Sequence, residues 1–149
     1  MPQTGRVSWI GIRPERRAVP QIVTAVVAIT DRGLAGDHYQ GKPGSKRQVT
    51  LIQAEHLAAV ASMMGLAELD PRLIRRNVVV AGINLLALKD RQFWVGEVLL
   101  EYTGLCHPCS RMEENLGAGG YNAMRGHGGI TARVVQGGTI KLNDPVKLK

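Results

Sequence analysis

The sequence predicts a mostly β protein built around a closed or nearly closed β-barrel, with one main helix and short helices in its loops. Two observations support this prediction. Short runs of apolar and β-branched residues recur along the chain, and glycines mark the turns between them. The regular alternation of strands and helices that a parallel doubly wound sheet needs is absent from the sequence.

Apolar segments in the first third of the chain predict its first strands. Residues 6–12 are short and apolar, and residues 21–30 are dense in β-branched side chains, so each predicts a strand with a buried face. Residues 31–46 hold four glycines and a proline, which predicts a loop without regular structure. Residues 48–52 predict the next strand. The later strands are expected at residues 77–81, 92–95, 98–102, 131–136, 139–142 and 146–148.

Helical spacing is convincing in one segment. Residues 53–64 are rich in good helix formers, and Gly65 suits the cap that ends such a helix. Asp70 and Pro71 predict a second, short helix ending near residue 76, because Asp caps a helix start and Pro suits its first position. The face of the main helix that we expect to be buried comprises Leu57, Val60, Ala61 and Met64.

Two further features complete the predicted organisation. Gly137 and Gly138 lie between two predicted strands and predict a β-hairpin there. Residues 108–125 are polar and predict a partly helical insertion. The whole chain, residues 1–149, is expected to form one domain, because its length is typical of one and suffices for a core.

Composition excludes several classes of protein. With 44% hydrophobic residues the chain is too apolar to be disordered, and two cysteines cannot build a disulfide framework. The longest apolar stretch, residues 22–29, is far shorter than the roughly 20 residues of a membrane-spanning helix. The N-terminal segment contains arginines but no apolar core of a secretory signal. We therefore expect a cytoplasmic protein without a membrane partner.

The charge balance favours anionic partners. Nineteen Lys and Arg residues against 12 Asp and Glu residues give a net charge of +7, which suits nucleic acid, a phosphorylated cofactor or an acidic protein. Aromatic residues make up only 4% of the chain, which argues against single-stranded nucleic acid because such binding uses aromatic stacking platforms. The basic residues near glycine-rich loops and near the cysteines are Lys42, Lys46, Arg47, Arg75, Arg76, Arg111, Arg125 and Arg133.

Both cysteines lie in one short segment after the predicted strand at residues 98–102. Cys106 and Cys109 form a C-x-x-C pair in the run GLCHPC. Such a pair is compatible with a dithiol redox centre, a zinc site that draws further ligands from elsewhere, or one thiolate ligand to a softer cofactor metal. Two small buried side chains without chemistry are the remaining alternative. Asp37 and His38 in GLAGDH leave a similar choice between an acid/base pair and a turn.

Five motifs in order resemble the MOSC domain, which is homologous to the C-terminal part of molybdenum cofactor sulfurase. They are GLAGDHYQG, RQVTLIQAEHL, RRNVVVAGINL, FWVGEVLLEYTGLCHPCSRME and RGHGGITARVVQGGTIKLNDPV. The resemblance extends over roughly residues 6–146. The resemblance is to the compact bacterial form that stands alone. It implies a MOSC-type β-barrel that carries a molybdenum cofactor, Mo-molybdopterin.

The resemblance also implies roles for individual residues. Cys109 matches the family's reactive thiol, so it is the candidate metal ligand or persulfide carrier, whereas Cys106 lies at a variable position and takes no role. Lys42 and Arg111 are basic residues that we expect near the cofactor's phosphate. The remaining candidate cofactor-binding residues, which match family motifs, are Gly36, Asp37, Arg47, Arg76 and Asn77.

Two functions from different classes follow from this resemblance. The first is an oxidoreductase that reduces N-hydroxylated or related N–O compounds at a molybdenum centre ligated by Cys109, with electrons from a separate reductase. The second is a carrier without redox chemistry, which passes molybdenum cofactor, or sulfur as a persulfide on Cys109, to a target enzyme. A basic barrel that binds nucleic acid and a dithiol oxidoreductase are the less favoured alternatives.

Overall fold

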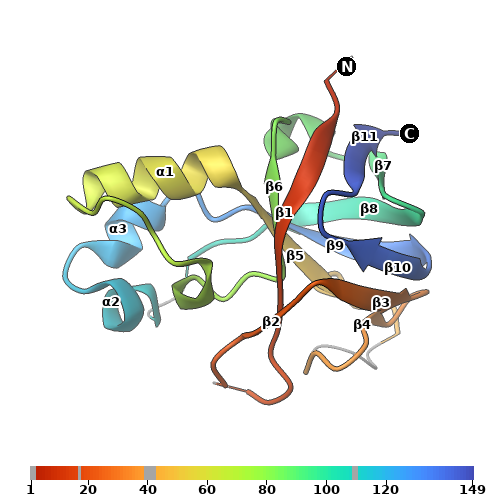
Figure 1. The fold of residues 1–149 in the computed structure, drawn as a ribbon, viewed down its shortest axis with the longest axis horizontal. Coiled ribbons are helices and arrows are strands. Elements are labelled where there is room, and N and C mark those ends of the chain that lie inside the picture. The colour runs from red at the N-terminus through yellow and green to blue at the C-terminus, as the bar shows by residue number, and fades with distance from the viewer. Residues whose placement is uncertain (1–2, 17, 39–42, 109–110) are drawn as a thin grey trace.

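The computed structural model describes residues 3–16, 18–38, 43–108 and 111–149, and its strands close into a barrel (Figure 1). The barrel is mixed, because β5 and β6 run parallel while the other neighbours run antiparallel. The predicted mostly β barrel is therefore confirmed. Around the barrel the order is β11 (Pro145–Leu148), β7 (Gln92–Val95), β8 (Val98–Leu105), β9 (Ile130–Gln136), β5 (Val49–Gln53), β6 (Val78–Ala81) and β1 (Gly5–Ile12), and β1 pairs back with β11.

The parallel pair depends on the main helix. Parallel neighbours need a crossover connection, and α1 (Ala54–Met63) with the short 3-10 helix η1 (Pro71–Leu73) provides it between β5 and β6. Gly65 follows α1 with a φ of 69°, a conformation that suits the predicted glycine cap. The second predicted helix is shorter than expected: Asp70 caps η1 by accepting from the Arg72 amide, and η1 ends at Leu73.

Alternating side chains on β5 and β6 join two apolar clusters. Leu51 and Val78 point into the barrel, whereas Ile52 and Val79 point outward to the helices, as the two-residue period of a strand requires. The outer cluster also contains Leu57, Val60 and Ala61 of α1, which confirms these three residues of the predicted buried face. The fourth, Met64, lies just beyond α1 and packs against the cluster partly buried. Each of these strands is thus covered on both sides.

Two predictions about strands are corrected by the structure. The segment 21–30 divides into β2 (Gln21–Val23), which extends the barrel sheet beside β1, and β3 (Ala25–Ile29), which belongs to a separate sheet. The prediction of a hairpin at Gly137 and Gly138 is wrong, because β10 (Gly138–Lys141) pairs with β3 instead of β9. The small sheet is completed by β4 (Gly33–Leu34), which lies within the segment expected to lack regular structure.

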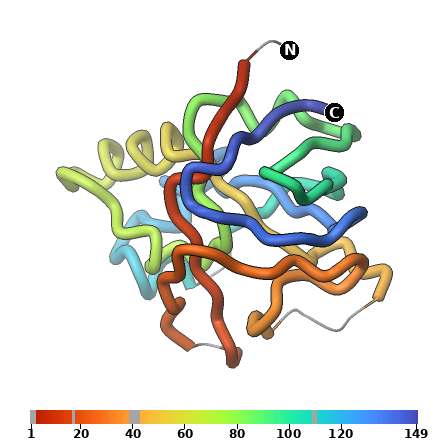
Figure 2. Tube along the Cα trace, turned by 45° about the vertical axis from the view of Figure 1, so that its right-hand side comes forward, coloured from red at the N-terminus to blue at the C-terminus, as the bar shows by residue number. Residues whose placement is uncertain are grey.

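The helices gather on one side of the barrel. In Figure 1, α1 lies beside α3 (Gly120–Met124), and α2 (Arg111–Leu116) lies on the other side of α3. The short 3-10 helix η2 (Leu85–Leu88) lies apart from them and follows β6 in the chain. The beginning of β1 and the end of β11 lie on the same side of the molecule in the two views of Figures 1 and 2. Within the described ranges, none of the helices has the length and apolar character needed to span a bilayer.

Candidate functional site

A buried polar network joins three of the segments that the sequence singled out. Asp37 Oδ1 accepts hydrogen bonds from the Arg13 amide at 2.9 Å and from Asn77 Nδ2 at 3.2 Å. Asn77 Oδ1 in turn accepts from the amide and the hydroxyl of Thr50 at 3.0 and 3.1 Å. Because buried polar groups are costly unless paired, this network fixes the long loop, β5 and β6 relative to one another.

Gly36 explains how Asp37 reaches that network. Gly36 has a φ of 85°, and a Cβ there would come within 3.1 Å of Ile12 Cδ1. The left-handed conformation turns the chain so that Asp37 enters the protein, where it is 4% exposed. In the part of the chain that the structure describes, the Asp37 carboxylate therefore accepts hydrogen bonds from Arg13 and Asn77, which are distant in sequence. This favours a structural role over the acid/base alternative.

Arg76 is buried between the beginning of β6 and the loops that flank β9. Its Nε donates to the Gly128 carbonyl at 2.7 Å, and its Nη1 donates to the Ile74 carbonyl at 2.8 Å. Its Nη2 lies 3.5 Å from the Cys106 carbonyl. A guanidinium that donates to several main-chain carbonyls holds these segments in fixed register.

Glycines permit this close approach. A Cβ at Gly128 would lie 2.0 Å from the Cys106 carbonyl oxygen, and one at Gly129 would lie 2.0 Å from the Leu51 carbonyl oxygen. The Cys106 amide also donates to the Gly129 carbonyl at 2.9 Å. Gly128 and Gly129 of the run RGHGGI are therefore required by close backbone packing against Cys106 and Leu51.

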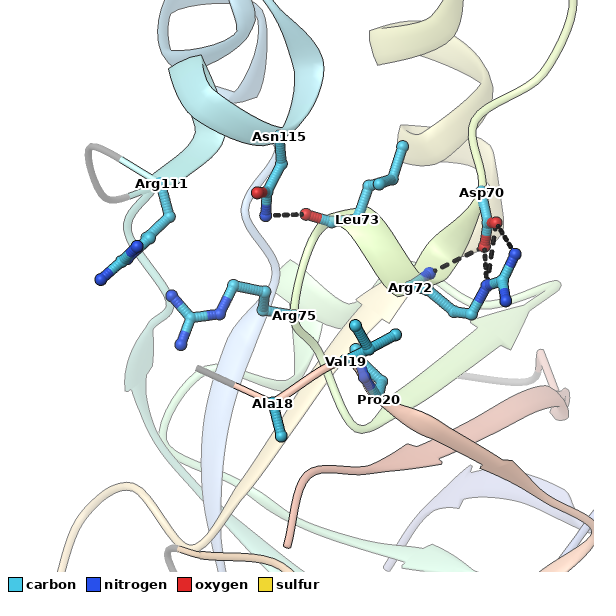
Figure 3. Close-up of a pocket in the computed structure, with 9 residues that line it drawn as sticks. All are labelled: Ala18, Val19, Pro20, Asp70, Arg72, Leu73, Arg75, Arg111 and Asn115. Carbon is cyan, nitrogen blue, oxygen red and sulfur yellow. Dashed lines mark hydrogen bonds and ion pairs between the residues drawn. The ribbon is translucent and has the colours of Figure 1, made fainter. Parts of the chain in front are cut away.

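An arginine-lined cavity of about 230 Å³ opens between η1, α2 and the chain before β2 (Figure 3). Arg75 and Arg111 line it from two different segments, and in Figure 3 the guanidinium group of Arg75 points toward that of Arg111. Arg75 has a φ of 63°, which is unusual for a residue other than glycine, and it lines the cavity whereas the neighbouring Arg76 is buried. We call this cavity the arginine pocket, and its other lining residues are Ala18, Val19, Pro20, Asp70, Arg72, Leu73 and Asn115.

Local ion pairs and hydrogen bonds fix the rim of the arginine pocket. Arg72 pairs with Asp70 at 2.7 Å, and its guanidinium and amide lower the pKa of that carboxyl. Arg111 pairs with Glu114 at 3.0 Å one helical turn further on, and Asn115 Nδ2 donates to the Leu73 carbonyl at 2.8 Å. Three arginines against one lining carboxylate leave the cavity with an excess of positive charge.

His38 lies near the same group of arginines. Burial lowers its pKa, and the positive charges of Arg13 and Arg75 lower it further, against the opposite effect of Asp37. The imidazole therefore favours its neutral form more than a solvated histidine does.

A second cavity, of about 200 Å³, lies against the other end of the cysteine segment. Cys106 is 2% exposed and lines this cavity together with His107 and Pro108. We call it the Cys106 pocket, and it is completed by Leu86, Leu105, Gly126, Gly128 and Gly129.

The sequence-predicted site residues fall into four groups. Cys109 and Lys42 lie outside the described residues, so their predicted roles stay predictions. Asp37, Asn77 and Arg76 form the buried framework, and Arg111 lines the arginine pocket. Arg47 is half-buried two residues before β5 and is not among the described lining residues of either pocket.

Sequence reasoning did not assign a cofactor role to Arg75, Arg72 or Asn115. Arg75 and Arg76 are adjacent, and the family motif points to the second of them. No periodicity in sequence distinguishes the two, because the positive φ at Arg75 decides which side chain faces outward. Asn115 is one turn along α2 from Arg111, a spacing that could have indicated it once α2 was known.

The donor set favours a phosphate-bearing organic group over a metal ion held by protein ligands alone. Within the described ranges, no group of three or more His, Cys, Asp or Glu residues is placed to hold a metal. The arginine pocket instead offers guanidinium donors beside the apolar side chains of Val19 and Leu73. Guanidinium groups match phosphate oxygens, so the residues present fit the anionic end of a pterin cofactor.

The barrel and its arginine pocket define a small mixed-barrel protein with an arginine-lined cavity between η1 and α2. The chain belongs to the MOSC domain family, whose model matches residues 36–147. MOSC domains are associated as a family with binding of the molybdenum cofactor. No match was found among curated proteins.

Solved structures share the fold. The YuaD protein from Bacillus subtilis has a TM-score of 0.84 and 19% identity, over 98% of this chain and 96% of that chain. YiiM from Geobacillus stearothermophilus has a TM-score of 0.77 and 17% identity, over 97% of this chain and 75% of that chain. YiiM from Escherichia coli has a TM-score of 0.72 and 18% identity, over 97% and 69% respectively.

Proposed function

We propose that this protein binds molybdenum cofactor and reduces N-hydroxylated or related N–O compounds, with Cys109 as the metal ligand. The observation that carries the proposal is the convergence of Arg75 and Arg111 in a cavity beside the cysteine segment. Arg111 is two residues beyond Cys109 in sequence. A site for phosphate is therefore joined by a short stretch of chain to the thiol that the family motif identifies.

The arginine pocket suits the anionic part of the cofactor. Arg75 and Arg111 approach from separate elements, so a phosphate between them would receive charge-assisted hydrogen bonds from both. Asn115 Nδ2 is engaged by the Leu73 carbonyl and fixes the rim on which Arg111 lies. Val19 and Leu73 offer apolar surface to the ring system.

The rest of the framework keeps the site in place. Arg76 ties the turn that carries Arg75 to the Cys106 carbonyl, and Asn77 ties the same strand to the long loop through Asp37. A thiolate at Cys109 is a soft ligand of the kind that soft cofactor metals prefer. Arg111, two residues beyond Cys109 in sequence, would favour the thiolate over the thiol, because a neighbouring positive charge stabilises the thiolate.

The cofactor, when bound, supplies a metal that exchanges electrons with the substrate. Reduction of an N-hydroxyl group to the corresponding N–H compound consumes two electrons and two protons and releases water. The electrons would come from a separate reductase, which is a partner that this proposal requires.

Analysis of metal and pterin content tests the proposal. The protein is purified from a host that makes the cofactor, beside its Cys109→Ser variant, and molybdenum and pterin are measured by mass spectrometry. We expect molybdenum near one equivalent per chain in the wild type and a large loss in the variant. Cofactor-free wild-type protein from such a host would contradict the proposal.

The same samples separate reduction from the carrier alternative. An oxidoreductase loaded with cofactor reduces benzamidoxime when an artificial electron donor is supplied. A carrier of cofactor, or of sulfur as a Cys109 persulfide, retains substoichiometric cofactor, reduces no benzamidoxime and activates a cofactor-free target enzyme. Loss of that activation in Cys109→Ser would then identify the carrier.

A further inference from the structure

The two cavities beside the cysteine segment differ in charge. The described residues that line the arginine pocket include three arginines, whereas those of the Cys106 pocket include none. Pro108 lines the Cys106 pocket and Arg111 lines the arginine pocket, and in sequence Cys109 lies between these two residues. Each cavity is therefore lined by one end of the same short segment, Pro108 at one end and Arg111 at the other. The difference in their charge suits the two cavities to ligands of different charge.

We propose that the Cys106 pocket is a binding site for a small uncharged compound, and that this compound is the N–O substrate. The identity of the substrate rests on the proposed function, whereas the existence of the site does not. Exclusion of a charged ligand follows from the lining, because an ion buried without a partner is strongly disfavoured.

The walls of the Cys106 pocket consist mainly of apolar side chains and glycine main chain. Leu86, Leu105 and Pro108 supply apolar surface, and Gly126, Gly128 and Gly129 contribute main chain without side chains. Leu86 and Leu105 are 40% and 49% exposed, which is unusual for large apolar side chains and places them where a ligand would enter. The Cys106 thiol and the His107 imidazole are the polar side chains among the described lining residues.

The size of the cavity limits the compound. A volume of about 200 Å³ lies below the roughly 300–1,000 Å³ typical of pockets for drug-sized ligands. A single ring bearing one polar N–O group is therefore the appropriate scale. The polar end would hydrogen-bond to the thiol, to the imidazole or to the glycine main chain, and the ring would contact Leu86 and Leu105.

Main-chain and side-chain hydrogen bonds also hold the wall of the Cys106 pocket in place. The Cys106 amide donates to the Gly129 carbonyl at 2.9 Å, and the Gly128 carbonyl accepts from Arg76 at 2.7 Å. These bonds fix two opposing parts of the wall before any ligand arrives, and a preformed wall lowers the entropic cost of binding.

Binding of benzamidoxime to cofactor-free Cys109→Ser protein tests this proposal. In that variant Cys106 is the only thiol in the sequence, so its alkylation by iodoacetamide reports on the pocket alone. A probe at ten times its Kd leaves about one site in eleven empty, so we expect alkylation to slow by about tenfold. Calorimetric titration measures the same binding independently of the thiol's reactivity.

Matched variants and a charged probe locate the site. Leu105→Trp narrows the entrance and should weaken benzamidoxime binding by about tenfold or more, equivalent to about 1.4 kcal/mol. Leu66→Trp alters a comparably exposed leucine, 44% accessible, that does not line the described cavity, and should leave binding unchanged. Benzoate, of similar size but anionic, should bind at least about tenfold more weakly than benzamidoxime.

The outcomes separate this inference from the proposed function. Three outcomes would overturn the proposed substrate site in the Cys106 pocket, even if the wild type retains molybdenum. They are undetectable benzamidoxime binding, equal effects of Leu105→Trp and Leu66→Trp, and binding of benzoate as tight as that of benzamidoxime. Selective benzamidoxime binding beside a cofactor-free wild type would support the pocket while contradicting the proposed function.

Discussion

The buried polar framework and the arginine pocket use adjacent residues of one motif in opposite ways. In the framework, Arg76 and Asn77 are 4% and 5% exposed and hydrogen-bond to main-chain carbonyls and to Asp37. In the pocket, Arg75 directs its guanidinium toward Arg111 and the cavity. The comparison teaches that charge alone does not identify a ligand contact, because one arginine of a pair supports the fold while its neighbour faces the site.

The largest expected effect is on stability, through Arg76. Replacing it in Arg76→Met leaves the Gly128 and Ile74 carbonyls without their donor, and buried unpaired acceptors cost about 1–3 kcal/mol each. We expect the free energy of unfolding in urea to fall by about 3 kcal/mol.

Two further variants make that result specific to the buried position. Arg76→Lys keeps a charged donor and should lose less stability than Arg76→Met. Arg75→Met removes the neighbouring arginine from the pocket and should cost less than about 1 kcal/mol, as is usual for substitutions outside the core. Equal losses for Arg75→Met and Arg76→Met would remove the distinction between framework and pocket.

The next effect concerns retention of the cofactor. Hydrogen bonds to charged groups are worth about 1.5–3 kcal/mol, so Arg75→Gln and Arg111→Gln should each weaken phosphate binding by about tenfold or more. The pterin and molybdenum content of the purified double variant should fall sharply, while its unfolding midpoint stays close to that of the wild type.

Arg133→Gln is the matched control for the pocket variants. Arg133 makes one exposed ion pair, with Glu101 at 2.9 Å, as Arg111 does with Glu114. It lies on β9 and is not a described lining residue of the arginine pocket. Cofactor loss in Arg133→Gln as large as in the double variant would mean that net charge, not pocket geometry, governs retention.

The smallest expected effect is a pH dependence of stability from His56. Burial and the nearby His127 lower the pKa of His56, and the two rings meet edge to face with centroids 5.0 Å apart. The unfolded chain therefore binds protons at a higher pH than the folded protein does, so stability is lost as the pH falls below the ordinary histidine range.

Urea unfolding at about pH 7.5 and about pH 5.5, on either side of the ordinary histidine pKa, measures this effect. The wild type should be less stable at the lower pH, and His56→Gln should show a smaller decrease. The pKa of His38 is also lowered, so some dependence should remain in the variant. A wild type that gains stability on acidification would contradict the assigned direction.

Local chemistry made much of the fold predictable. β5, with its apolar and β-branched residues, and α1, with its helical spacing and following glycine, were predicted within a residue or two because propensity, patterning and burial agree there. The Gly137–Gly138 hairpin failed because a glycine pair signals a change of direction and does not specify the partner strand. Thr24 lies between β2 and β3, where no local signal showed that one apolar run serves two sheets.

The sequence by itself determined the mostly β class, the main helix with its buried face, and the membership of the motifs in one family. Tertiary structure alone decided which residues meet, because Asp37 and Asn77 are 40 positions apart and bond only when the loop folds onto β6. It also decided that Arg76 turns inward while Arg75 faces the cavity. The physical reason is that backbone conformation and long-range packing set side-chain direction, and neither is encoded by residue type alone.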